Sequence, residues 1–501
     1  MTTTADEVDA GACPPGDTDC ALREAVVAAA ASSEADTINV PAGRYVLTIA
    51  RGSGVGSAAD GDLDLGDPAS PSGNLTITGA GARATTVDGG GLDRVFEVQP
   101  GQVAEISGLT VTGGNSPVSG GGVQVADGAA DGTLTLRSVT VSGNFADGDG
   151  GGIDNNGNLT VIASTISGNR TEDQGGGIEH DDTTTVINST ISANRADGTG
   201  SDGGGGGFDN DGDDIDAPET EGQMTVTNST ITGNTTAGTG GGITNDAGGS
   251  FGEATFKNTI VGGNSADLGG ANCSGVEDIT SAGGNLESGD TCEFTASGDQ
   301  RNADPQLGPL QDNGGQTDTH ALPAGSPAVD LADAGACPAT DQRGVQRPQG
   351  SGCDVGAFEF APPTTTPTPI PTPAPAPAPT AVPVAAAPGP QPAGAVLGVR
   401  IDSIARLPSA RRCVSRRSFR IRLRAPGGER LVRAEVYVNG RRVRVVRGRR
   451  LTAPVDLRGL PKGRFRIEIR VTTASGKRLA GKRRYRTCVP KRRAGRRPPP
   501  V

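Results

Sequence analysis

Short runs in which apolar and polar residues alternate recur between residues 100 and 290, for example Leu-Thr-Leu at 134–136 and Val-Thr-Val at 139–141. Alternation with a period of two is typical of half-buried β-strands. The spacing of apolar residues typical of a helix is missing from these runs, which excludes a helical repeat. We therefore expect many short strands in this part of the chain.

These strands belong to an internal repeat. Six Thr/Ser-rich strands end in an asparagine, and each is followed by a Gly-rich step into an aliphatic or small residue. The asparagines are Asn115, Asn144, Asn169, Asn194, Asn234 and Asn264. Their spacing of 25 to 40 residues includes a loop inserted around 199–222. A repeat of about 25 residues with two or three strands predicts one coil of a solenoid, because one coil alone cannot bury its apolar face.

Consecutive parallel strands connect with right-handed crossovers in nearly all proteins, so we predict an all-β fold whose body is a right-handed parallel β-helix. Residues at equal repeat positions would stack about 4.8 Å apart. Asparagine suits such a column because its amide both donates and accepts hydrogen bonds. The six asparagines are therefore a predicted structural ladder.

A short helix is predicted over 19–32, with Asp19 or Thr18 as its N-cap and one apolar face. Strands are predicted at 37–40 and 44–49. A solenoid needs its open end covered, and we expect this N-terminal region, residues 1–50, to be the cap. The β-helix repeats then fill 51–272, and a further module follows at 273–361.

The remaining sequence differs in pattern. Residues 362–397 are rich in Pro, Thr and Ala and predict an extended linker. Residues 398–490 contain Arg-rich runs with period-two alternation and a tight-hairpin signal at Asn439-Gly440, which together predict an Ig-like β-sandwich. Residues 491–501 form a basic tail.

Composition changes this picture in two ways. Gly numbers 80, Trp is absent and aromatic residues make up 3%, so an ordinary globular core is excluded and disorder is the alternative to a solenoid. Residues 398–501 hold 33 Lys/Arg against 5 Asp/Glu, whereas residues 1–397 hold 12 against 52. Such asymmetry indicates separate modules with separate partners.

The eight cysteines fall in local pairs, none with CxxC spacing. The pairs are Cys13/Cys20, Cys273/Cys292, Cys337/Cys353 and Cys413/Cys488. Pairing within modules favours disulfides and an oxidising compartment, with unrelated thiols as the alternative. The first residues, Met-Thr-Thr-Thr-Ala-Asp-Glu, have no basic or apolar signal region; a removed signal or a misassigned start would be compatible with secretion.

Three stretches resemble families of bacterial surface proteins. Cys20-Ala-Leu-Arg-Glu-Ala-Val resembles the CSLREA motif, and the Gly/Asn-rich coils resemble right-handed β-helix proteins such as polymorphic outer-membrane proteins. Residues 273–360 resemble the choice-of-anchor Q domain, through Asp304-Pro-Gln-Leu-Gly-Pro-Leu, Ser326-Pro-Ala-Val-Asp, Asp341-Gln-Arg-Gly and Cys353-Asp-Val-Gly-Ala-Phe-Glu. The resemblance implies export and attachment to the cell envelope.

Aligning the repeats places Asp154, Glu179 and Asp209 in one column. If the preceding Ile and Phe residues point inward, alternation turns these acids outward. We expect a hydrated acidic face; the functional alternative is Ca²⁺ that bridges adjacent coils, with Asp211 as a further ligand. No other cofactor is expected.

Other polar residues have a structural interpretation. His180 falls in the column of Asn155, Asn210 and Asn245, where a turn residue replacing asparagine is expected. His320 is expected to be a structural hydrogen-bonding residue. Asp341, Arg343 and Arg347 are best explained as an ion-paired loop held by Cys337 and Cys353, and a lyase-type acid–arginine pair is the alternative.

Two functions remain. The first is a secreted or surface-displayed structural or adhesive protein, with no catalytic residue, that binds an anionic envelope polymer or polysaccharide through its Arg-rich strands. The second is a polysaccharide-degrading lyase or glycoside hydrolase, since β-helices also carry such enzymes. Sugar-stacking aromatics are scarce, which favours the first. We expect a monomer at the cell surface, with no nucleic-acid partner and no transmembrane segment.

Overall fold

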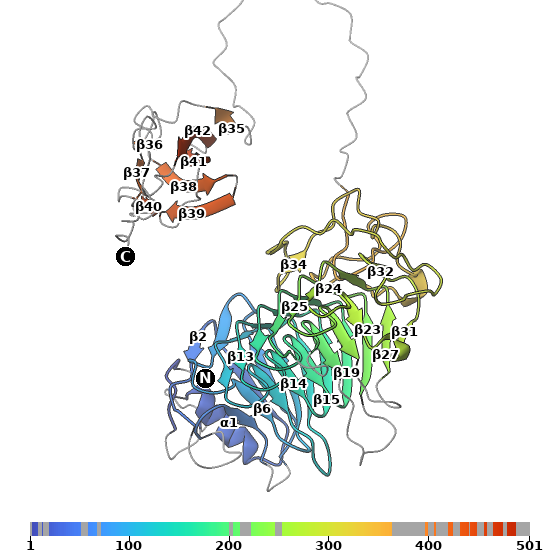
Figure 1. The fold of residues 1–501 in the computed structure, drawn as a ribbon. Coiled ribbons are helices and arrows are strands. Elements are labelled where there is room, and N and C mark those ends of the chain that lie inside the picture. The colour runs from blue at the N-terminus through green and yellow to red at the C-terminus, as the bar shows by residue number, and fades with distance from the viewer. Residues whose placement is uncertain are drawn as a thin grey trace, which may run out of the picture. The chain divides into compact units, whose positions relative to one another are not determined.

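The computed structural model describes residues 3–8, 13, 20–51, 59–67, 72–199, 204–210, 222–245 and 253–362, and the strands between 396 and 486. The chain forms two compact units, Met1–Thr368 and Pro369–Val501. The first unit is a stack of coils with a helix at one end and a loop-rich module at the other (Figure 1).

The body of the first unit is a parallel β-helix, which confirms the prediction from the repeats. Each full coil runs through four sheets, numbered 1 to 4 in chain order. Sheet 1 consists of β1 (Asp36–Val40), β4 (Leu75–Gly79), β7 (Val103–Ser107), β11 (Thr133–Arg137), β15 (Asn158–Ile162), β19 (Thr183–Ile187), β23 (Gln223–Thr227), β27 (Ala254–Lys257) and β31 (Ile279–Ser281). Sheet 2 consists of β2 (Gly43–Val46), β5 (Thr85–Asp88), β8 (Thr110–Thr112), β12 (Thr140–Ser142), β16 (Thr165–Ser167), β20 (Thr190–Ser192), β24 (Thr230–Thr232), β28 (Ile260–Gly262) and β32 (Leu286–Glu287).

Two further sheets close each coil. Sheet 3 is short and consists of β9 (Asn115–Ser116), β13 (Phe145–Ala146), β17 (Arg170–Thr171), β21 (Arg195–Ala196), β25 (Thr235–Thr236) and β29 (Ser265–Ala266). Sheet 4 consists of β3 (Leu63–Leu65), β6 (Phe96–Val98), β10 (Val123–Val125), β14 (Ile153–Asn155), β18 (Ile178–His180), β22 (Phe208–Asn210), β26 (Ile243–Asn245) and β30 (Cys273–Ser274).

Equal repeat positions stack in register from coil to coil. In sheet 4, Ile153 pairs with Ile178, which pairs with Phe208, and all three are fully buried. The same holds for the alternate apolar residues of sheets 1 and 2, which join one continuous core along the solenoid. Stacked coils thus bury the faces that one coil would leave in water.

The bend from sheet 1 to sheet 2 uses a single residue in the left-handed region. Ala163 has φ 51°, and Asn188, at the equivalent position one coil later, has φ 50°. Asparagine tolerates this conformation better than most residues, which explains its recurrence at this bend in the later coils, at Asn228 and Asn258.

The N-terminal helix α1 spans Leu22–Ala30, a shorter segment than the predicted 19–32. The predicted caps, Thr18 and Asp19, lie outside the described residues. Instead, the Glu24 carboxylate accepts a hydrogen bond from the backbone N–H of Ala21 at 2.8 Å. Leu22 and Val26 are buried in the solenoid core, so the helix covers its first coil as expected.

The last coil reaches β30, β31 and β32, and therefore extends to Glu287, beyond the predicted boundary at 272. After it, the chain folds back across sheet 2 with little regular structure. This return module contains β33 (Leu310–Gln311) and β34 (Thr319–His320), and one short helix, η2 (Ala334–Ala336). Another short helix, η1 (Val276–Asp278), precedes β31. Ile260 and Leu286 of sheet 2 share a hydrophobic cluster with Phe358 and its neighbours in the module.

The described strands of the second unit form two sheets. A five-stranded sheet has the order β35 (Val396–Gly398), β42 (Arg478–Arg486), β41 (Arg464–Thr473), β38 (Leu431–Val438) and β39 (Arg441–Arg447). A three-stranded sheet contains β36 (Ala405–Arg406), β37 (Phe419–Leu423) and β40 (Val455–Leu457). Ala405 and Ile421 of the smaller sheet belong to the same buried cluster as Val436 and Ile469 of the larger one. The hairpin predicted at Asn439-Gly440 joins β38 to β39, while the Ig-like assignment stays a prediction.

Candidate functional site

The outer face of sheet 2 carries a column of residues, one per coil, and six successive positions of it are threonines. Because alternate residues of a strand point to opposite faces, the apolar middle residue of each strand points into the core and its neighbours point outward. The column contains Arg44, Thr86, Thr110, Thr140, Thr165, Thr190, Thr230, Ile260 and Leu286. It therefore changes along the solenoid from polar to apolar.

The later part of this column lies under the return module. Thr165 donates a hydrogen bond to the backbone carbonyl of Asp318 at 2.6 Å, and Thr190 donates to the Gln342 side-chain carbonyl at 2.6 Å. Thr230 accepts from the backbone N–H of Ala357 at 3.1 Å. All three threonines are buried, so the module is a tightly docked cover of this half.

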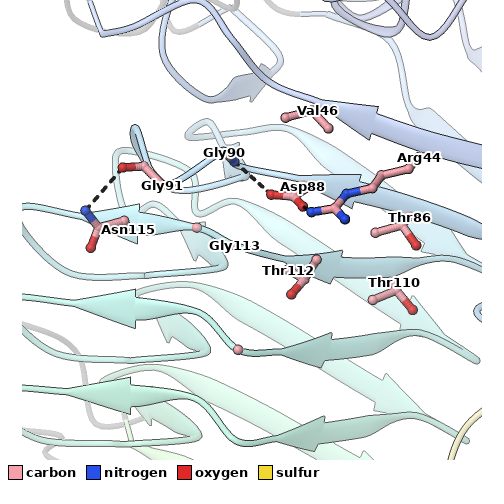
Figure 2. A pocket seen from close by; sticks show the side chains of 12 residues that line it. Arg44, Val46, Thr86, Asp88, Gly90, Gly91, Thr110, Thr112, Gly113 and Asn115 are labelled. Carbon is pink, nitrogen blue, oxygen red and sulfur yellow. Dashed lines mark hydrogen bonds and ion pairs between the residues drawn. The ribbon is translucent and has the colours of Figure 1, made fainter. Parts of the chain in front are cut away.

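The earlier part of the same face forms an open groove of about 840 Å³ (Figure 2). Its floor comes from β2, β5 and β8, and the side chains of Thr86 in β5 and of Thr110 and Thr112 in β8 line it. Gly143 also belongs to the lining. The turn at Gly90 and Gly91 and the side chain of Asn115 border it. Asn115 donates to the carbonyl of Gly91 at 3.3 Å, which fixes this border.

Charge in the groove is balanced locally. Arg44 pairs with Asp88, whose second oxygen accepts from the backbone N–H of Gly90 at 2.9 Å. Gly113 has φ 67°, and a Cβ atom there would lie 2.3 Å from Asp88 Oδ1, so only glycine fits. Among the described lining residues, Arg44 and Asp88 are the only ionisable side chains. This lining suits hydrogen bonding to a polar ligand.

A second candidate is a column of carboxylates on the other outward face, that of sheet 4. Its residues are Asp64, Glu97, Gln124, Asp154, Glu179 and Asp209, followed by Thr244. The strand register thus confirms that Asp154, Glu179 and Asp209 stack in one column, as the repeats predicted. The structure extends that column by two further acids toward the N-terminus.

The expected hydrated acidic face is wrong, because these side chains are covered. Asp154, Glu179 and Asp209 are 3%, 5% and 0% exposed. The Gly-rich step of each repeat folds over the column: Gly175 has φ 64°, and a Cβ atom there would lie 2.4 Å from the Cβ of Glu179. Strand alternation predicted the outward direction of the acids but could not reveal this cover.

Burial dominates the electrostatics of the column. It raises the pKa of Asp154, and it raises the pKa of Glu179 well above the usual value, with a further increase from the charge of Asp154. Burial also raises the pKa of Asp181 to about 6. One oxygen of Glu179 has no hydrogen-bond partner among the described residues. The middle of the column therefore favours a proton or a bound cation.

The N-terminal end of the column has its own counter-ion. Arg94 pairs with Glu97 at 2.5 Å and with Asp62 at 3.5 Å. Asp62, Asp64 and Glu97 also have ligand atoms within 4.8 Å of one another, which is close enough for one metal ion. Burial raises the pKa of Asp62 to about 8 and that of Asp64 to about 7. Asp211, the fourth predicted calcium ligand, lies outside the described residues.

The predicted asparagine ladder runs through most of the solenoid. The side-chain amides of Asn144, Asn169, Asn194 and Asn234 each donate to the next asparagine at 3.0 Å, and Asn264 continues to Asn272 at 3.2 Å. Asn115 is not part of it: it is exposed and pairs in register with Phe145, while Gly114 occupies the ladder position. The extra glycine before Asn115 shifts it by one residue.

Three of the four predicted disulfides are present: Cys13–Cys20, Cys273–Cys292 and Cys337–Cys353. Cys413 and Cys488 lie outside the described residues. The second bridge joins the last coil to the loop that covers it, since Cys292 and Phe294 belong to the solenoid core.

Both histidines have structural surroundings, one inside the solenoid and one between the module and sheet 2. His180 pairs in register with Asn155 and Asn210, as aligned, but it is the last residue of β18 and fully buried, so the expectation of a turn residue is wrong. Burial lowers its pKa to about 4. His320 is hydrogen-bonded to Ser192 at 2.9 Å and to the carbonyl of Gly308 at 2.7 Å, so its contacts join the module to sheet 2.

The charged residues of the module are paired with one another. Arg343 pairs with Asp341 at 2.6 Å and lies over the ring of Phe358. Arg347 is buried, pairs with Glu359 at 3.4 Å and donates to two backbone carbonyls. These contacts match the interpretation of an ion-paired loop.

The groove was not among the predicted site residues, although a signal for it exists. In most repeats a Thr precedes the apolar residue, as in Thr140-Val-Ser and Thr165-Ile-Ser. These hydroxyls predict a polar outer column, but not which part of it the module covers. Comparisons with protein-family models, curated proteins and solved structures found no match for this chain.

Proposed function

We propose that this protein is an extracellular binding protein, in which a β-helix is displayed at the cell envelope and attached to anionic polymers through the basic second unit. Disulfides within the first unit support an oxidising compartment. In the part of the chain that the structure describes, no helix has the length and apolar character needed to cross a bilayer.

The resemblance to CSLREA-motif and choice-of-anchor Q proteins is part of this proposal. The motif residues have clear structural tasks: Arg23 is buried, pairs with Asp6 at 2.6 Å and donates to the carbonyls of Gly61 and Asp62. It thus ties the cap to the first coil.

The observation that carries the attachment is a pair of like charges on the five-stranded sheet. Arg466 of β41 lies directly opposite Arg484 of β42, and both side chains are exposed. Neither forms an ion pair with a described acid. Directly opposed like charges on one face of a sheet destabilise it, and a bound anion would relieve this repulsion.

Three other described cations on this sheet are neutralised by acids. Arg433 pairs with Glu435, and Arg470 and Lys482 both pair with Glu468. Among the described side chains, Arg466 and Arg484 thus form an opposed pair without an acidic partner, and Arg486 is exposed two residues further along β42. Guanidinium groups bind carboxylates and phosphates with two parallel hydrogen bonds, which suits polyanions of a cell envelope.

The enzymatic alternative has less support. Glycoside hydrolases use two carboxyl groups on either side of the scissile bond. The described lining of the groove has one carboxylate, Asp88, which is paired with Arg44. The carboxylates of sheet 4 lie beneath the Gly-rich turns.

The attachment is tested by retention of the full chain on beads coated with polyphosphate, with neutral dextran beads as the reference. We expect retention at 0.1 M salt and release at 1 M, because the Debye length falls from about 10 Å to about 3 Å. The double variant Arg466→Gln/Arg484→Gln should bind at least about tenfold more weakly, since each lost charge-assisted hydrogen bond is worth about 1.5–3 kcal/mol.

A matched control removes the same net charge from paired positions, as Arg433→Gln/Arg470→Gln. We expect a smaller effect from it. Equal losses in the two double variants would indicate attraction by net charge alone, and retention that survives 1 M salt would reject electrostatic attachment.

A further inference from the structure

One column of hydroxyls on sheet 2 is half covered and half open. The return module covers it from Thr165 onward, and the open groove begins where this cover ends. Thr140, at the boundary between them, is half-buried, and Thr110 lies in the groove. Covered and open parts are thus one continuous surface with the same chemistry.

We propose that the groove binds an extended polypeptide segment of a partner protein, held by backbone carbonyls and by carboxamide side chains. The covered half of the column supplies the argument, because there the same threonines already bind polypeptide. The inference rests on this interface and is independent of the attachment through the second unit.

Gln342 demonstrates how a carboxamide fits the column. Its carbonyl oxygen accepts from Thr190 at 2.6 Å, and its amide nitrogen donates to Thr165 at 2.8 Å. These threonines are neighbours in adjacent coils. A carboxamide offers one acceptor and one donor group side by side, and thus bridges two hydroxyls that are about 4.8 Å apart.

Backbone groups of the module use the same column. The carbonyl of Asp318 accepts from Thr165, and the N–H of Ala357 donates to Thr230. The threonine hydroxyls therefore bind both kinds of main-chain group, which every extended polypeptide presents.

The open half repeats this arrangement in part. Thr110 donates to the backbone carbonyl of Ala82 at 2.6 Å, as Thr165 donates to that of Asp318, and its oxygen can still accept from an incoming amide. Thr140, Thr110 and Thr86 follow one another in register, as Thr165 and Thr190 do. The hydroxyls of Thr86 and Thr140 have no hydrogen-bond partner among the described residues. Gly143 lacks a side chain at the border, and a Cβ atom there would meet only Thr112 Oγ1 at 3.4 Å, which permits close approach of another backbone.

The lining of the groove suits a sugar chain less well than a polypeptide. Sugar rings bind well to aromatic side chains, and the described lining of the groove contains none. Its Arg44–Asp88 pair is internally neutralised, so a neutral polar ligand suits the groove better than a charged polymer.

The probe is a fluorescein-labelled octapeptide that alternates Gln and Thr, titrated with the full chain at 1 M salt to suppress binding to the basic unit. An octapeptide that alternates Met and Thr has similar side-chain length without the carboxamide. We expect at least fivefold tighter binding of the Gln peptide. Thr110→Val and Thr140→Val should each weaken it by about fivefold to tenfold, as expected for loss of one or two hydrogen bonds.

The matched control is Thr135→Val, an outward, half-buried threonine of sheet 1 in the same coil as Thr140. It should leave peptide binding unchanged, as should Arg466→Gln/Arg484→Gln. The proposal is overturned if neither peptide binds, if both bind equally, or if Thr110→Val/Thr140→Val binds as the control does. Binding of maltoheptaose in place of the peptides would also overturn it. Loss of polyphosphate binding alone would concern only the attachment.

Discussion

At the scale of single residues, the interior asparagines combine two tasks. Each Asn of the ladder donates to the next coil and also to a backbone carbonyl of the preceding one, as Asn194 does to Ile166 at 3.0 Å. Its own oxygen accepts from both the backbone and the side chain of Asn169. A buried amide is stable here because its hydrogen bonds are all satisfied.

We predict that Asn194→Ala lowers the free energy of unfolding by about 3 kcal/mol. It leaves two donors of Asn169 buried without partners and removes one hydrogen bond from the carbonyl of Ile166, and each unsatisfied donor costs about 1–3 kcal/mol. Urea denaturation measures the effect. The control is Asn115→Ala, because Asn115 is exposed and should change stability by less than about 0.5 kcal/mol. Equal effects of the two substitutions would contradict the ladder's role.

At the scale of an element, sheet 4 stacks like charges under cover. The carboxyls with raised pKa hold protons in the folded state that the unfolded chain releases above about pH 4. Their contribution to stability is therefore complete at acidic pH and is lost as pH rises through the folded-state pKa values, which reach about 8 at Asp62.

We accordingly predict that the first unit is less stable at pH 8 than at pH 5. Glu179→Gln should raise stability at pH 8 by about 1 kcal/mol or more and flatten the pH dependence, because the amide keeps the shape without the charge. Thermal melts between pH 4 and pH 9 measure this. As control, Glu105→Gln removes a half-buried acid on the outward face of sheet 1 that pairs with Arg137. A parent protein with equal melting temperatures at pH 5 and pH 8 would refute the prediction.

The same melts test the alternative that Ca²⁺ bridges adjacent coils at this column. A cation bound only to the folded state raises the melting temperature. We expect such an increase at pH 8 in millimolar Ca²⁺, and its loss on replacing Asp154, Glu179 and Asp209 by amides. Equal melting temperatures in Ca²⁺ and in a chelator would contradict Ca²⁺ binding and indicate that protons neutralise the column.

At the scale of the whole first unit, the return module is attached by non-covalent contacts to sheet 2 and stiffened by its own disulfide. Cys337–Cys353 closes a loop within the module, whereas Cys273–Cys292 belongs to the last coil. The two bridges therefore stabilise different parts of the unit.

We predict that Cys337→Ser/Cys353→Ser loosens the module and leaves the coils intact. The expected cost is about 2–4 kcal/mol, confined to the module. Limited proteolysis should cut first within the return module, at residues 302–361. The far-UV circular dichroism spectrum should still show the β-structure of the coils. The control, Cys273→Ser/Cys292→Ser, should instead expose the last coil. Cleavage spread evenly over the unit would show that module and coils unfold together.

The repeats by themselves determined the solenoid, the direction of its side chains and most of the ladder. The alternation of apolar and polar residues is local and recurs in every repeat, so each repeat favours the same coil structure. The same reasoning placed Asp154, Glu179 and Asp209 in register. It failed at Asn115, where one extra glycine shifts the position within the coil.

Tertiary structure alone decided what covers each face. Whether Glu179 is hydrated depends on how the Gly-rich step folds back over it, and the repeat pattern does not encode that path. Likewise Thr110 and Thr165 are equivalent in sequence, yet one lines an open groove and the other is buried under the module. Their difference arises from contacts with residues more than 150 positions away, such as Asp318, because burial is set by packing between distant segments.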